Sequence, residues 1–136
     1  MNKIKNILFV CKHNVFRSRI AEIFFNKFNK NKNYVARSAG LIPGKNLVNS
    51  QVEVAKKLGL DLNGKPQPIT LDLLRNTDLM VVVADDVPPK IFDNKKYGRT
   101  EYVWKITDDK TGSPEEIYNI IKKIEKKIKS FVESLK

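Results

Sequence analysis

The chain has 136 residues, of which 41% are hydrophobic and 30% are charged. This length suits one domain with one core, here residues 1–136, and the composition excludes a disordered chain or a fibrous repeat. The net charge of +11 indicates either an anionic partner or a generally basic surface. A single Cys excludes an intramolecular disulfide, and a single Cys with a single His excludes a Cys/His-type zinc site. We therefore predict no metal and no cofactor.

The apolar run nearest the N-terminus, residues 7–10, is too short for the core of a signal peptide. No stretch of the sequence approaches the ~20 apolar residues that a membrane-spanning helix needs. We therefore expect a cytoplasmic protein with no membrane partner, in which the lone thiol stays reduced.

Predicted strands and helices alternate along the first half of the chain. The run 7–10 is rich in strand formers and predicts a strand covered on both faces, and the apolar spacing from Ile20 to Phe28 predicts a helix. A second short strand is expected over residues 34–36. A helix around residues 52–58, closed by Gly59, and a short helix over 71–74 follow.

The second half of the chain repeats this alternation. Residues 79–83 form another fully apolar run that predicts a buried strand, and residues 102–104 suggest a last strand. A long helix should begin after Ser113, which we expect to cap it, with Glu116 completing a capping box. Alternating strands and helices predict a single α/β domain, an open parallel sheet of about four strands flanked by helices. In such folds ligands bind at the carboxyl ends of the strands.

The segment that follows the first strand, Cys11-Lys-His-Asn-Val-Phe-Arg17-Ser18, carries the main chemical signal. A cysteine that faces a helix N-terminus lies where free N–H groups and the helix dipole favour the thiolate form. The successive N–H groups of such a loop bind anions, and the fork of Arg17 matches two oxygens of a tetrahedral oxyanion. The chemistry indicated is attack by sulfur on a bound oxyanion. The alternative is a cysteine that serves only as a small core hydrophobe.

The pattern Ile7-Leu-Phe-Val-Cys-x-x-Asn-x-x-Arg-Ser18, followed by Ala21-Glu22, resembles the low-molecular-weight protein tyrosine phosphatase family. That family includes the thioredoxin-coupled arsenate reductases. Residues 37–40, 78–82 and 104–109 resemble its later strands and acid loop. The resemblance implies the flavodoxin-like fold of that family and a cysteine-dependent phosphate-monoester hydrolase.

The resemblance also assigns roles to individual residues. It makes Cys11 the nucleophile, Arg17 the oxyanion clamp and Asp108 the general acid. Ser18 would stabilise the thiolate, with a plain helix cap as a compatible alternative, and Asn14 would hold the loop through Ser38. The expected oxyanion-binding loop comprises Lys12, His13, Asn14, Val15, Phe16, Arg17 and Ser18.

The sequence departs from the family pattern at several positions. His13 stands where phosphatases often carry Gly and is closer to the arsenate-reductase branch, whereas Phe16 replaces a cysteine found in many relatives. The acid loop has Asp108-Asp109 where the family usually has Asp-Pro. Counting from Trp104 favours Asp108 as the acid, with Asp109 as the alternative. Loss of the proline predicts a more mobile loop.

The expected substrate is a phosphorylated protein or a small phosphate ester, or else arsenate reduced with the help of an external thiol. The sequence supports activity on phosphotyrosine less strongly than phosphatase-like chemistry in general, since no aromatic side chain follows Asp109 closely. For Asp85 and Asp86 we expect a cap at the start of a loop, with an acid or metal role as the alternative. The last helix carries many lysines, for which a solvated face is expected. A third reading is a polyanion-binding protein, but nucleic acid is not the expected partner.

Overall fold

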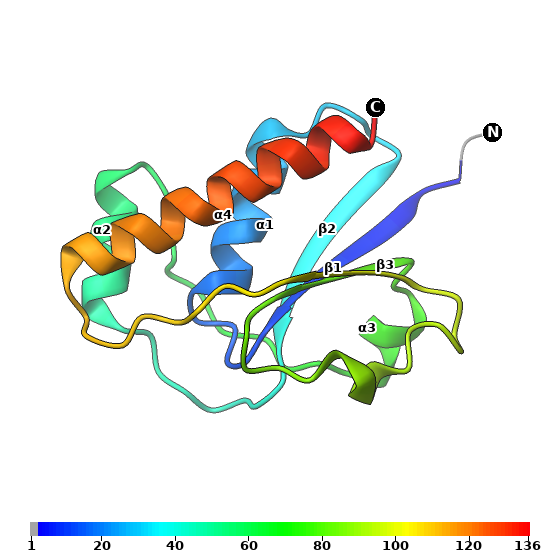
Figure 1. Cartoon of the computed structure of the whole chain (residues 1–136), viewed down its shortest axis with the longest axis horizontal. Coiled ribbons are helices and arrows are strands. Elements are labelled where there is room, and N and C mark those ends of the chain that lie inside the picture. Colours follow the sequence, from blue (N-terminus) through cyan, green and yellow to red (C-terminus); the bar gives the residue numbers. More distant parts are fainter. Residues whose placement is uncertain (1–2) are drawn as a thin grey trace.

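The computed structural model describes residues 3–136 and contains a four-stranded sheet in the order β2-β1-β3-β4 (Figure 1). The strands are β1 (Lys5–Cys11), β2 (Tyr34–Gly40), β3 (Leu79–Val83) and β4 (Thr100–Trp104), and every neighbouring pair is parallel. The predicted α/β fold with a parallel sheet is therefore confirmed. The second strand extends to Gly40, beyond the predicted 34–36.

The helices lie close to their predicted positions. They are α1 (Arg17–Phe28), α2 (Asn49–Lys57), α3 (Leu71–Arg75) and α4 (Pro114–Ser134). A short 3₁₀ helix, η1 (Pro89–Phe92), was not predicted and begins at the second of two consecutive prolines. Among residues 3–136, none of the helices has the length and apolar character required to cross a membrane.

The two faces of the sheet are covered unequally. On one face, Phe9 and Val81 of the central strands pack with α1, α2 and α4 in the larger core cluster. On the other face, Val10 and Met80 pack against a smaller cluster that includes residues of α3 and η1. This alternation follows from the pleat of the strands, which sends successive side chains to opposite faces.

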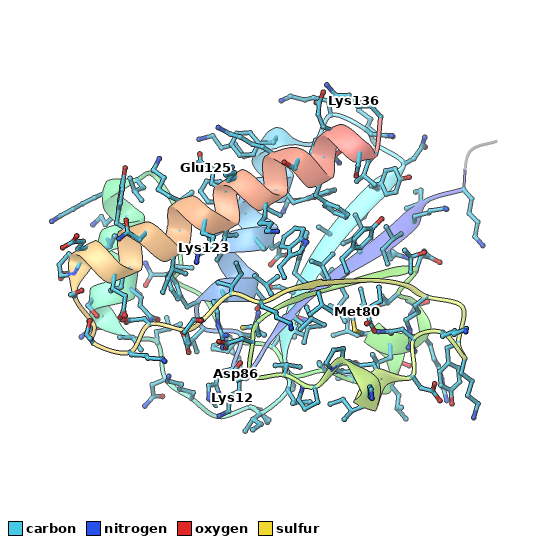
Figure 2. The ribbon with its side chains drawn as sticks, in the orientation of Figure 1. Lys12, Met80, Asp86, Lys123, Glu125 and Lys136 are labelled. Carbon is cyan, nitrogen blue, oxygen red and sulfur yellow. The ribbon has the colours of Figure 1, made fainter. Side chains whose placement is uncertain are left out.

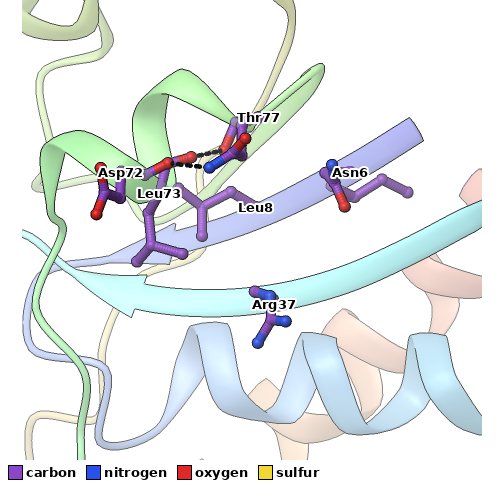
Figure 3. Close-up of a pocket in the computed structure, with 8 residues that line it drawn as sticks. Asn6, Leu8, Arg37, Asp72, Leu73 and Thr77 are labelled. Carbon is purple, nitrogen blue, oxygen red and sulfur yellow. Dashed lines mark hydrogen bonds between the residues drawn. The ribbon is translucent and has the colours of Figure 1, made fainter. Parts of the chain in front are cut away.

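The thinner layer on the α3 side leaves a cavity of about 290 Å³ between α3 and strands β1 and β2 (Figure 3). Leu8 and Arg37 point into it from the strands, and Asp72 and Thr77 border it from α3 and the segment after it. None of the predicted site residues lines this cavity.

The parallel register brings the carboxyl ends of the strands to one edge of the sheet. Cys11 pairs with Gly40 at the ends of β1 and β2, and Val83 pairs with Trp104 at the ends of β3 and β4. Lys12 and Asp86, which follow the paired strands β1 and β3, therefore both lie at this edge of the sheet (Figure 2). The segments that leave these strand ends are the ones that carry the candidate site.

The start of α4 corrects one prediction. Ser113 caps the helix, since the Glu116 amide donates to its Oγ at 3.1 Å. The reciprocal bond of a capping box is not formed, because the Ser113 amide donates to Thr111 Oγ1 instead. The side chain of Glu116 turns toward the preceding loop, where it accepts the amides of Lys110 and Thr111.

Candidate active site

Cys11 lies at the carboxyl end of β1 with its side chain buried under the loop that follows. Its sulfur accepts the Asn14 amide at 3.2 Å and lies 3.0 Å from Ser18 Oγ. Within the part of the chain that the structure describes, the amides of His13, Val15 and Phe16 have no protein acceptor. The loop thus presents free N–H donors around the sulfur, as an anion site requires.

Asn14 holds the loop in its unusual shape. Its φ of 58° lies in the left-handed region, which Asn tolerates better than most other residues. Its side-chain amide donates to Ser18 Oγ at 2.8 Å and to Ser38 Oγ at 3.0 Å, and its Oδ1 accepts the Gln67 amide at 2.8 Å. The structure therefore brings Asn14, Ser18 and Ser38 into one hydrogen-bonded network.

This network fixes the direction of the Ser18 hydroxyl. Because Asn14 Nδ2 already donates to Ser18 Oγ, the hydroxyl proton is free to point at the sulfur of Cys11. The alternative role as a helix cap is wrong, since Phe16 is the N-cap of α1 and makes no side-chain capping bond. Ser18 Oγ is thus placed where it can donate to the Cys11 sulfur.

Gly40 allows the loop to pass close to the end of β2. A Cβ atom built at Gly40 would lie 2.5 Å from the His13 carbonyl carbon and 2.7 Å from the Asn14 nitrogen. Real Cβ atoms do not approach backbone so closely, so any side chain here would push the loop out of place. The close approach of the loop therefore explains on steric grounds why the Arg37-Ser-Ala-Gly40 segment ends in a glycine.

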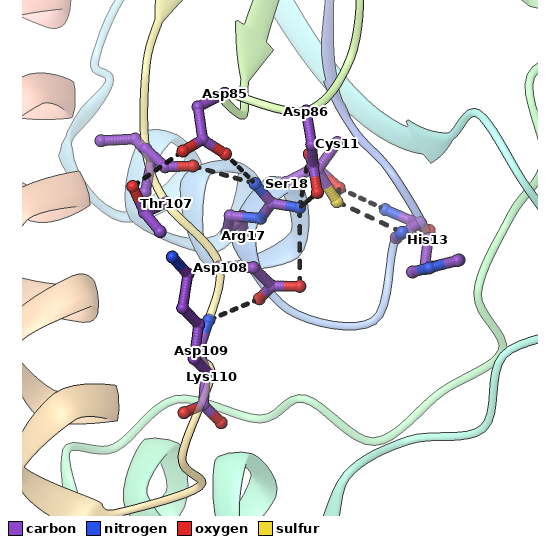
Figure 4. Close-up of polar contacts among 12 residues, drawn as sticks. Cys11, His13, Arg17, Ser18, Asp85, Asp86, Thr107, Asp108, Asp109 and Lys110 are labelled. Carbon is purple, nitrogen blue, oxygen red and sulfur yellow. Dashed lines mark hydrogen bonds and ion pairs between the residues drawn. The ribbon is translucent and has the colours of Figure 1, made fainter.

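Arg17 is buried, with only 1% of its surface exposed, and its guanidinium is held from several sides (Figure 4). Its Nη1 donates to the Ile106 carbonyl at 2.9 Å, and its Nη2 donates to both oxygens of Asp86 at 3.0 and 3.3 Å. Asp85 and Asp108 complete the surroundings, at 3.7 and 3.6 Å from the guanidinium. A buried cation needs such partners, and several N–H donors of the fork remain available for an oxyanion.

The expectation that Asp85 and Asp86 act as loop caps is wrong. Neither carboxylate accepts a backbone amide within residues 3–136; Asp86 accepts Arg17 and Asp85 accepts the Thr107 hydroxyl at 2.8 Å. The reason is topological, since the carboxyl end of β3 lies beside that of β1 and turns these side chains toward the buried arginine. In the described part of the chain, no group of His, Cys, Asp and Glu residues is arranged to hold a metal ion.

The two adjacent aspartates of the acid loop point to different partners. Asp108 faces Arg17, and its Oδ1 accepts the Asp109 amide at 2.8 Å (Figure 4). Asp109 turns away from Arg17, accepting the Gly112 amide at 2.8 Å and Gln51 Nε2 at 3.2 Å. Only Asp108 therefore lies beside the oxyanion loop.

Two carboxylates fix this loop in the absence of the proline. Glu116 Oε1 accepts the amides of Lys110 and Thr111 at 2.8 and 2.9 Å and the Thr111 hydroxyl at 3.1 Å, and Asp109 ties the loop to α2 through Gln51. The hydrogen bond from Asp109 and those from the loop amides lower the pKa of Glu116 to about 2, whereas burial and the hydrogen bond with Glu116 raise the pKa of Asp109. These side-chain hydrogen bonds anchor the loop at the position where the proline is missing, and the greater mobility of the loop stays a prediction.

Replacing Glu116 by Gln should lower the melting temperature at neutral pH, and the difference from the wild type should shrink in acid. Because folding lowers the pKa of Glu116 from 4.5 to about 2, its carboxylate contributes stability above pH 4.5 that is lost as the pH falls toward 2. Thermal unfolding followed by circular dichroism between pH 2 and pH 7 checks this. Glu115→Gln is the matched control, since Glu115 is exposed in the same helical turn and should show no such pH-dependent difference. A difference that stays constant across this range would contradict the anchoring role.

Sequence reasoning missed several residues that complete the site. Glu22 accepts the Ser38 hydroxyl at 2.6 Å, and Gln67 supplies the amide that Asn14 accepts. The only available signal for Glu22 was its place in the Ala21-Glu22 pair one helical turn after Ser18. Gln67 participates through its backbone, so its side-chain type gave no signal.

The chain is similar to known proteins both in sequence and in fold. A family model described as low molecular weight phosphotyrosine protein phosphatase matches residues 6–136. No curated protein gives a significant match. Among solved structures, a YwlE mutant from Bacillus subtilis superimposes with a TM-score of 0.83 at 21% identity, covering 96% of this chain and 98% of that one.

Two further structures extend the comparison. A low molecular weight protein tyrosine phosphatase from T. tengcongensis has a TM-score of 0.81 at 23% identity, with 96% of this chain and 99% of that chain covered. An arsenate reductase from Archaeoglobus fulgidus has a TM-score of 0.72 at 25% identity, with 93% and 98% covered. The similar folds thus include both a phosphatase and an arsenate reductase.

Proposed function

Because the chain belongs to the low molecular weight phosphotyrosine protein phosphatase family, whose members are enzymes, we propose that it hydrolyses phosphate monoesters through Cys11. The observation that carries the proposal is the sulfur of Cys11 in a loop with free amides, 3.0 Å from Ser18 Oγ and before the helix that begins at the buried Arg17. This arrangement supports a nucleophile and an oxyanion clamp that act on the same phosphoryl group.

The first step transfers the phosphoryl group to sulfur. The thiolate of Cys11 attacks phosphorus in line with the leaving oxygen, so that the S–P bond forms as the P–O bond breaks. Loop amides and Arg17 stabilise the charge on the equatorial oxygens. Asp108 donates its proton to the leaving oxygen, and the departing group leaves as a neutral alcohol.

The second step releases phosphate. The Asp108 carboxylate accepts a proton from water, whose oxygen attacks phosphorus as the S–P bond breaks. The electron pair returns to sulfur, and the Ser18 hydroxyl stabilises the regenerated thiolate. Besides the substrate, each step uses only backbone and side-chain groups of this chain and water.

The direct test of this proposal is hydrolysis of 4-nitrophenyl phosphate by the purified protein. We expect the rate of phosphate release to be proportional to the enzyme concentration. Alkylation with iodoacetamide should abolish this activity, since Cys11 is the only thiol in the chain. Absence of phosphate release from every aryl and alkyl phosphate tried, by a protein shown to be folded, would contradict the proposal.

Arsenate reduction is the second candidate, because the arsenate reductase from Archaeoglobus fulgidus shares this fold and His13 is closer to that branch. Arsenate matches phosphate in charge and shape, so the same loop and Arg17 would bind it. The thioredoxin-coupled reaction passes through further cysteines of the reductase, which this chain lacks. An external low-molecular-weight thiol such as glutathione would have to take their place.

We therefore expect no arsenate reduction with thioredoxin, thioredoxin reductase and NADPH alone. The measurement is NADPH consumption after arsenate is added, repeated with glutathione and its reductase in place of the thioredoxin system. Steady arsenate-dependent oxidation of NADPH in the thioredoxin system would contradict this expectation, because one thiol in the chain cannot form the intramolecular disulfide that thioredoxin reduces.

A further inference from the structure

A groove of about 660 Å³ lies on the α3 side of the molecule, apart from the residues of the candidate site. One wall is formed by α3, with Leu71 and Arg75, and the other by η1 and the segment that follows it, with Ile91 and Tyr97. Arg99, just before β4, borders the groove between these walls. None of these five residues has a role in the proposed reaction.

The apolar side chains of the groove are unusually exposed. Leu71, Ile91 and Tyr97 leave 69%, 56% and 64% of their surfaces open to solvent. A single exposed apolar residue is ordinary on a protein surface, but three that border the same concave surface mark a place where another molecule can bury them.

Arg99 supplies a fixed positive charge between the walls. Its Nε donates to the Leu74 carbonyl at 3.1 Å, and its Nη1 donates to the Phe92 carbonyl at 3.0 Å and to Asn94 Oδ1 at 3.1 Å. These bonds join the two walls and hold the guanidinium in place, yet Arg99 forms no ion pair within residues 3–136. Its Nη2 has no acceptor in the same part of the chain.

The charged residues that line the groove are mostly basic. They are Arg75 and Arg99, against Asp93 as the one carboxylate among the lining residues. This charge is complementary to carboxylates and repels basic segments. The combination of exposed apolar side chains with positive charge therefore defines the chemistry of the occupant.

We propose that this groove binds an acidic segment of a partner protein whose carboxylates pair with Arg75 and Arg99 and whose apolar side chains pack on Leu71, Ile91 and Tyr97. An extended or helical peptide that carries both carboxylate and apolar side chains matches the positive charge and the exposed apolar residues of the groove. A purely anionic chain matches only the charge. The proposal does not depend on the activity of Cys11.

The test uses a short fluorescent peptide in which Glu residues flank Leu residues, titrated with the full-length protein and followed by anisotropy. We expect binding that weakens with added salt, and amide chemical-shift changes in labelled protein that map to α3, η1 and residues 97–99. Arg75→Glu should weaken binding about tenfold, a loss of about 1.4 kcal/mol. This variant changes an exposed side chain, so folding should survive.

Lys126→Glu is the matched control, since it makes the same charge change at an exposed position on α4. It should weaken binding by less than about twofold, as expected for a distant charge. Equal weakening by Lys126→Glu and Arg75→Glu would overturn the proposal, because the peptide would then be responding to overall charge. Equal binding of a peptide with Ser in place of Leu, or of a single-stranded oligonucleotide with the same dependence on Arg75, would also overturn it.

Discussion

Replacing Cys11 by Ser is expected to lower the turnover of 4-nitrophenyl phosphate by at least about 10⁴-fold, in line with the loss of a catalytic nucleophile in other enzymes. The serine hydroxyl is far less acidic than a thiol and remains protonated at neutral pH, so it is a poor nucleophile toward phosphorus. Steady-state release of nitrophenolate measures the effect. The rest of the site stays in place, since Ser differs from Cys by one atom.

A measurement of phosphate binding distinguishes a variant that has lost only the nucleophile from one whose binding site is disrupted. Cys11→Ser should still bind inorganic phosphate, which can be followed by chemical-shift changes in the amides of Val15 and Phe16, because these donors do not depend on the sulfur. The melting temperature should change little, since the buried position keeps its size. Turnover close to that of the wild type would exclude Cys11 as the nucleophile.

Most of the fold could be predicted from local patterns. The apolar runs 7–10 and 79–83 have no polar interruption, which is the pattern of strands buried on both faces of a parallel sheet. The spacing of Ile117, Ile121 and Ile128 fixed the buried face of α4, and all three are fully buried. By contrast, η1 covers only four residues and has no periodicity that a sequence pattern could reveal.

The reactive loop could be located because its residues are contiguous. Cys11, Asn14, Arg17 and Ser18 lie within eight consecutive positions between a strand and a helix, so their proximity follows from local structure. The partners of the buried guanidinium come from elsewhere in the chain. Asp86 lies 69 positions from Arg17, and only the pairing of β1 with β3 brings the two segments together.

The hydrogen-bond partners of the side chains in the acid loop could not be predicted from the sequence. Glu116 has the residue type and spacing of a capping box, yet it accepts amides of the loop, and the Ser113 amide donates to Thr111 Oγ1 instead. That choice depends on how the loop crosses the start of α4. In the same loop, Asp109 turns toward Gly112 and Gln51, whereas Asp108 faces Arg17.

This division of roles determines the expected behaviour of two matched variants. Asp108→Asn should lower kcat on phenyl phosphate by about 10²–10⁴-fold, the usual contribution of a general acid, because phenolate is a poor leaving group. The loss on 4-nitrophenyl phosphate should be much smaller, since nitrophenolate needs little protonation. Asp109→Asn keeps an oxygen for the Gly112 amide, so it should affect both substrates similarly and mildly. Measuring kcat for the wild type and the two variants on the two substrates gives the six values needed. A leaving-group-dependent loss in Asp109→Asn alone would reverse the assignment, and its absence from both variants would direct attention to Asp85 and Asp86, which also lie beside Arg17.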